Sequence, residues 1–100
     1  MERLADDALG QYIVTTESGS RYWLDLDQRT ARRKAGPPSQ DTLQLRRDGE
    51  VVGLVEVVRC RVGLPMVLLI DLEVPGVWMT TRESTSVSHI RPARNSGLTR

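Results

Sequence analysis

The chain has 100 residues, of which 39% are hydrophobic and 27% charged, and a formal net charge of +1. This is the length of one ordinary domain and the composition of a globular protein, which excludes a second core. A charge so close to zero predicts no strong overall attraction to nucleic acid or to an acidic membrane. Cys60 is the only cysteine, which excludes a disulfide framework and a cysteine-rich metal site.

Residues 1–9 precede the predicted domain. They are charged and lack the apolar stretch of a signal peptide, so we expect a cytoplasmic protein. Leu4, Ala8 and Leu9 would lie loosely on one side of one or two helical turns, which are too few to be stable alone. We therefore predict an N-terminal leader that is either flexible or a short helix.

Residues 10–26 predict a β-hairpin. Gln11–Thr16 and Arg21–Leu26 are rich in β-branched and aromatic residues, and Glu17–Ser20 has turn chemistry with Gly19 free to adopt positive φ. A two-residue turn at Ser18-Gly19 would place Ile13, Thr15, Tyr22, Leu24 and Leu26 on the core face. The outer face would then hold Tyr12, Val14, Thr16, Arg21, Trp23 and Asp25.

The next segments predict short strands separated by turns. Asp27–Thr30 predicts a turn capped by the side chain of Asp27, and Thr30–Lys34 a polar strand at an edge of the sheet. The prolines of Ala35–Gln40 indicate a loop. Beyond it we expect strands at Thr42–Arg46 and Val51–Val58, joined by a hairpin turn at Asp48-Gly49.

The run Met66–Ile70 is the only continuous apolar stretch, and it predicts a central strand at Met66–Leu72 that is buried on both faces. Glu73–Gly76 has the proline and glycine positions of a type II turn. Val77–Thr81 is expected to pair back onto the central strand, and Thr85–Ile90 to form a last short strand. Residues 91–100 are polar and predict a disordered tail.

Short strands with turn signals every eight to twelve residues are typical of all-β proteins. We predict one all-β domain over residues 10–90, with about six to eight short antiparallel strands. The expected geometry is a small, partly open β-barrel of the SH3-like or OB-like kind. A small sandwich is the alternative.

Motifs of catalysis and cofactor binding are absent from the sequence. There is no phosphate-binding glycine loop, no His-x-x-x-His pair and no Cys-x-x-Cys pair. Ser88 and His89 would point to opposite faces of a strand, which argues against a catalytic pair. Asp25 and Asp27 are spaced like the start of a calcium loop, but a turn-capping Asp27 and a solvent-facing Asp25 explain them better. We predict a non-enzymatic protein without a cofactor or a metal.

Basic and aromatic residues suggest one candidate binding surface, consisting of Arg21, Trp23, Arg32, Arg33, Lys34, Arg46 and Arg47. Tryptophan and arginine are enriched at interface hot spots, so the leading prediction is binding to another protein or to a second copy. A basic groove with a stacking aromatic also suits single-stranded nucleic acid, which is the alternative. A third interpretation is a solvated edge neutralised by nearby acids. We expect no membrane partner.

Cys60 lies between two arginines, which would lower its pKa if the thiol were exposed; a buried, inert thiol is the alternative.

A resemblance to other proteins rests on turn and strand residues in six segments. These segments are Tyr12–Thr16, Ser18–Tyr22, Leu24–Leu26, Leu45–Glu50, Cys60–Gly63 and Ser84–Val87. In these segments the chain resembles small, generally uncharacterised β proteins of GC-rich bacteria and their phages. The resemblance implies an all-β fold and an origin in a bacterium or phage, and it implies no activity.

Overall fold

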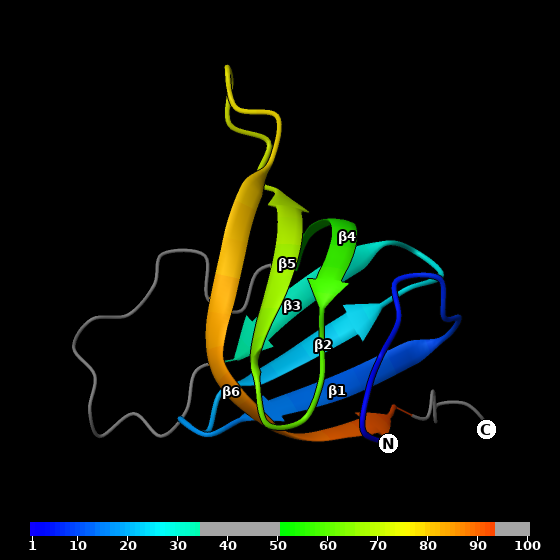
Figure 1. Cartoon of the computed structure of the whole chain (residues 1–100). Coiled ribbons are helices and arrows are strands. Elements are labelled where there is room, and N and C mark those ends of the chain that lie inside the picture. Colours follow the sequence, from blue (N-terminus) through cyan, green and yellow to red (C-terminus); the bar gives the residue numbers. More distant parts are fainter. Residues whose placement is uncertain (35–50, 94–100) are drawn as a thin grey trace.

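The computed structural model describes residues 1–34 and 51–93, which contain strands but no helix. The strands are β1 (Gln11–Thr16), β2 (Arg21–Asp25), β3 (Thr30–Lys34), β4 (Val51–Arg59), β5 (Pro65–Asp71) and β6 (Thr80–Pro92). Each strand pairs antiparallel with the next, and β6 pairs with β1, so the sheet closes into a six-stranded barrel (Figure 1). The predicted fold class, a small all-β barrel, is confirmed.

The hairpin of β1 and β2 forms where it was predicted, but its register differs by one residue. Val14 lies opposite Tyr22, and Thr16 accepts the Gly19 N–H while its own N–H bonds to Ser20. The loop therefore has three residues and ends in Gly19 at a φ of 89°, a known hairpin geometry. Since neighbouring residues point to opposite faces, this shift reverses the predicted faces of β1. Val14 is fully buried in the core, whereas Ile13 lies on the outer side beside Trp23, where it is also buried at 5% exposure.

The strand β3 is not an edge strand, contrary to the prediction. It pairs with β2 along its length and with β4 through Thr30, Ala31 and Arg32. The turn before β3 is capped by Asp25 rather than by Asp27, because the Asp25 carboxylate accepts the N–H groups of residues 27 and 28. The strand predicted at Thr42–Arg46 and the turn at Asp48-Gly49 lie outside the described residues.

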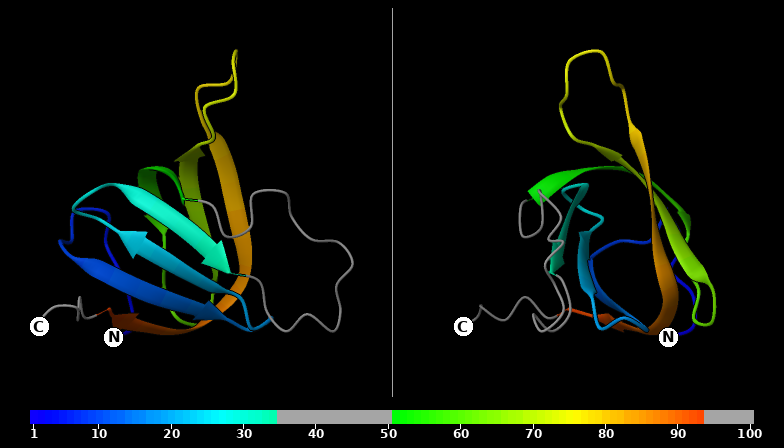
Figure 2. Two further views of the ribbon diagram at one scale, coloured as in Figure 1. Left: turned by 180° about the vertical axis from the view of Figure 1, so that it is seen from behind. Right: turned by 90° about the vertical axis from the view of Figure 1, so that its left-hand side faces the viewer.

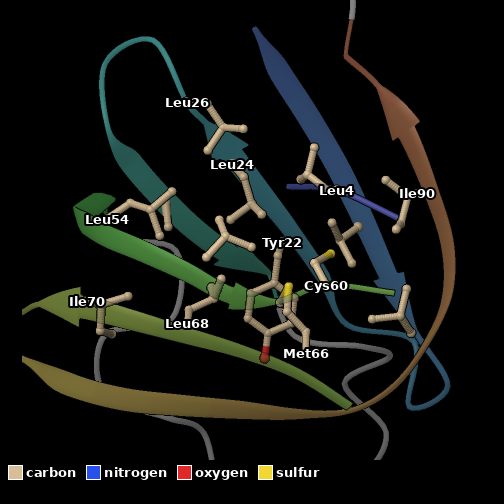
Figure 3. Packing of buried hydrophobic residues seen from close by; sticks show 14 residues of the cluster. Leu4, Tyr22, Leu24, Leu26, Leu54, Cys60, Met66, Leu68, Ile70 and Ile90 are labelled. Atoms are coloured by element: carbon tan, nitrogen blue, oxygen red, sulfur yellow. The ribbon is translucent and has the colours of Figure 1, made fainter. Parts of the chain in front are cut away.

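The core lies inside the barrel and is almost entirely aliphatic (Figure 3). In β5, Met66, Leu68 and Ile70 are buried, whereas the residues between them are half-buried. The prediction of a strand buried on both faces was therefore wrong: β5 has one core face, as in any barrel strand. In β4 the register shifts at Val55 and at Val58, and these two bulges turn both Leu54 and Val57 inward.

The strand β6 is a single 13-residue element where two strands were predicted. Residues 80–86 pair with β5 and residues 87–92 pair with β1, so one strand changes partner along its length. The predicted strand at Val77–Thr81 does not form before Thr80. Residues 72–79 instead form a projecting arm between β5 and β6 (Figures 1 and 2), which we call the β5–β6 arm.

The N-terminal residues 1–9 do not form the short helix that was one of the two predictions for them. They run across one end of the barrel, and we call them the N-terminal strap. Leu4 is 3% exposed and packs in the core, and its N–H donates to the Cys60 carbonyl at 2.9 Å. The strap is ordered because the open end of the barrel offers both an apolar site and free backbone groups.

Candidate binding surface

The outer surface of β2 and β3 presents Trp23 at its centre. The register places a row of residues across four strands and the end of β6, in the order Arg91, Ile13, Trp23, Arg32 and Val51. A second row beside it contains His89, Thr15, Arg21 and Lys34. We call these two rows the basic face. Trp23 is 40% exposed, so a large part of its indole ring is accessible.

The basic face is positively charged, and its cations form no ion pair with another residue of the described ranges 1–34 and 51–93. Its charged residues are Arg21, Arg32, Lys34 and Arg91, and Asp25 is the acid beside them on β2. Within residues 1–34 and 51–93, the single ion pair joins Arg29 to Asp6, away from this face. The Arg32 guanidinium lies 5.3 Å from the centre of the Trp23 ring, which is within cation–π range. The cations are therefore available to an acidic partner.

A hollow of about 130 Å³ lies next to Trp23. It is lined by both apolar and polar groups, among them Trp23, Asp25, Thr30, Arg32 and Val51. This volume is below the several hundred Å³ typical of small-molecule sites. The hollow suits one inserted side chain or base better than a whole cofactor.

The structure brings together four of the predicted site residues and separates a fifth. Arg21, Trp23, Arg32 and Lys34 share the basic face, because they alternate along two paired strands. Arg33 points to the opposite, inner side. Its guanidinium lies 5.9 Å from the centre of the Tyr22 ring and donates to the Ser20 hydroxyl at 3.2 Å. The grouping of Arg33 with its neighbours was therefore wrong.

Arg46 and Arg47 lie outside the described residues. Sequence reasoning missed Arg91 and His89, which β6 contributes through its pairing with β1. No short-range sequence pattern predicts the pairing of β1 with β6, since the two strands come from opposite ends of the domain. The exposed Val51 was also missed, because the β3–β4 pairing brings it beside Arg32. Ile13 lies in the same row but is only 5% exposed, so it supports the surface from below.

Ser88 and His89 do not form a catalytic pair in the described structure. The Ser88 hydroxyl donates to the Thr15 carbonyl at 3.1 Å, and no hydrogen bond joins it to His89. In the described part of the chain, no group of three or more His, Cys, Asp or Glu residues could hold a metal ion. Cys60 is 2% exposed, and its burial raises the pKa of the thiol to about 12. The alternative of a buried, unreactive thiol is the one that the geometry favours.

No helix within residues 1–34 and 51–93 is long and apolar enough to cross a membrane. No family model, no curated protein and no solved structure matches this chain. The basic face is therefore interpreted from its own chemistry.

Proposed function

We propose that the protein is a non-enzymatic, cytoplasmic binding module whose basic face makes a protein–protein contact, either with a different protein or with a second copy of this chain. The observation that carries the proposal is the exposed Trp23 ring surrounded by cations without ion pairs in the described residues. Tryptophan and arginine at the centre of a patch are the usual anchors of protein interfaces. The nearby 130 Å³ hollow could take one side chain of the partner. The resemblance to small β proteins of bacteria and phages is compatible with a binding role.

Affinity purification from cells that produce the protein tests this proposal. We expect a protein partner, identified by mass spectrometry, to be recovered with the wild-type chain and lost with Trp23→Ala. Truncating such an anchor removes at least ~2 kcal/mol of binding free energy, or about 30-fold in affinity. Arg61→Glu is the control, because Arg61 is exposed and lies outside the basic face. Equal recovery of every partner with Trp23→Ala would contradict the proposal.

Single-stranded nucleic acid is a second candidate, favoured by the same row of cations beside a stackable ring. The backbone phosphates would contact Arg21, Arg32 and Lys34, and a base would stack near Trp23. Binding of a labelled oligo-dT would then weaken steeply as salt increases. Absence of any binding at low salt would exclude this candidate.

A further inference from the structure

The β5–β6 arm exposes apolar side chains at the end of the barrel. Trp78 is 86% exposed, and Val74, Val77 and Met79 are each at least 40% exposed. The arm extends from the barrel on the side away from β1 and β2 (Figures 1 and 2), so it does not cover the basic face of its own chain. An exposed apolar element of this kind marks an interaction site.

Local hydrogen bonds define the backbone conformation of the arm. The Val77 N–H donates to the Val74 carbonyl at 3.0 Å, and Gly76 between them has a φ of 83°. At the base of the arm the Glu73 N–H donates to the Asp71 carboxylate at 2.7 Å. A preformed turn that presents Trp78 loses little conformational entropy on binding.

The charge of the arm is opposite to that of the basic face. Glu73 is the one charged residue of the arm, and Asp71 lies at its base, at the end of β5. The basic face combines four cations with an aromatic ring and a hollow of about 130 Å³. An apolar arm that carries a carboxylate, and a surface with four cations and a side-chain-sized hollow, are complementary in charge.

We infer that the partner of the basic face is a second copy of this chain, with Trp78 of one copy docked beside Trp23 of the other. This inference rests on the proposed function, since it names the partner of the same face. The contact joins two different surfaces, so it is heterologous. In a dimer held by one such contact, the first copy keeps a free basic face and the second keeps a free arm. Further copies can therefore add on, unless the contacts close into a ring or a reciprocal dimer.

Analytical ultracentrifugation of the purified full chain over a concentration series tests the inference. We expect the wild-type mass to rise with concentration, and the variants Trp78→Ala and Arg32→Glu each to weaken association at least ~10-fold. The first variant keeps its basic face and the second keeps its arm. Mixed in equal amounts, they should therefore form a dimer that neither forms alone. Leu9→Ala and Arg61→Glu are the matched controls, since both residues are exposed and lie outside the two surfaces.

Three outcomes would overturn the inference. One is a wild-type chain that stays monomeric at all concentrations, and another is a mixture of the two variants that forms no dimer. The third is saturable binding of oligo-dT to the basic face of a protein that does not self-associate. The affinity purification separates this failure from failure of the proposed function. A monomeric chain that recovers a different protein, and loses it with Trp23→Ala, would overturn the inference but leave the proposed function standing.

Discussion

At the scale of single residues, Asp6 is the side chain that holds the N-terminal strap to the barrel. Its carboxylate accepts the Val57 N–H at 2.7 Å and the Arg29 guanidinium at 2.8 Å. Arg29 also donates to the Val55 carbonyl at 3.0 Å, and its backbone has a φ of 57°. Positive φ is uncommon for a residue other than glycine. These contacts stabilise that conformation and connect the strap, the β2–β3 turn and β4.

The first prediction concerns the charge of Asp6. The Val57 N–H and the Arg29 guanidinium lower the pKa of this carboxyl from 3.8, so the folded state favours the ionised form. The stabilisation is therefore complete above the unfolded pKa and is lost as the pH falls through the lowered, folded pKa. We expect Asp6→Asn to reduce the free energy of unfolding by about 0.5–1 kcal/mol at pH 7, and the difference to disappear at acid pH.

Urea denaturation of the wild type and Asp6→Asn from pH 7 down to pH 2 measures this effect. Asp7→Asn removes the same charge from the neighbouring, exposed position and is the control. A constant difference between wild type and Asp6→Asn at every pH would show that the charge of Asp6 is not involved.

At the scale of elements, the sequence identifies strands by their apolar residues and turns by their glycines. This predicts β1, β2, β4 and β5 well, because each contains apolar or β-branched residues between turn signals. The polar β3 also forms at the predicted residues, since turn residues flank it. The prediction fails between Thr81 and Thr85, where one continuous strand was divided into two and no residue is a core apolar one. This hydroxyl-rich half of β6 is positioned by its hydrogen bonds to β5, which no local pattern indicates.

The second prediction concerns the turn between β1 and β2. Gly19 adopts a φ of 89°, a conformation in which the Cβ of another residue would lie too close to the following carbonyl oxygen. We expect Gly19→Ala to lower the free energy of unfolding by about 1–2 kcal/mol, as measured by urea denaturation. Glu17→Ala, at an exposed position of the same loop, should change it little. An unchanged stability in Gly19→Ala would mean that the loop can take a different turn type.

At the scale of the whole molecule, the basic face depends on closure of the barrel. Arg21 and Trp23 were predicted to share a face because alternation along a strand can be deduced from the sequence. The basic residues of β3 were added as a cluster, which wrongly included Arg33. Arg91 joins the basic face only because β6 pairs with β1. Ring closure depends on contacts between distant segments, which no local pattern encodes. The candidate site was therefore predictable in its centre and not at its margin.

The third prediction concerns the closed end of the barrel. Leu4 packs in the same core cluster as Cys60, and the backbones of these residues are hydrogen-bonded. We expect Leu4→Ala to destabilise the protein by about 2–5 kcal/mol, as other buried leucine truncations do. It should also increase the rate at which a thiol reagent modifies Cys60 under native conditions. Leu9→Ala is the control, since Leu9 is 76% exposed. Equal reaction rates in the two variants would show that the strap does not protect the thiol.

Because β6 pairs with β1, the barrel closes only when segments far apart in the sequence meet. The hairpins β1–β2, β2–β3 and β5–β6 join neighbouring segments and can form early, at small entropic cost. The β1–β6 ladder pairs Tyr12 with Pro92, across nearly the whole chain. Closing so long a loop is slow, and contacts of this kind limit folding rates. During synthesis, β1 therefore remains without its second neighbour until the C-terminal half of β6 leaves the ribosome. Until then, the unsatisfied edge of β1 is the part of the nascent chain most exposed to wrong pairing.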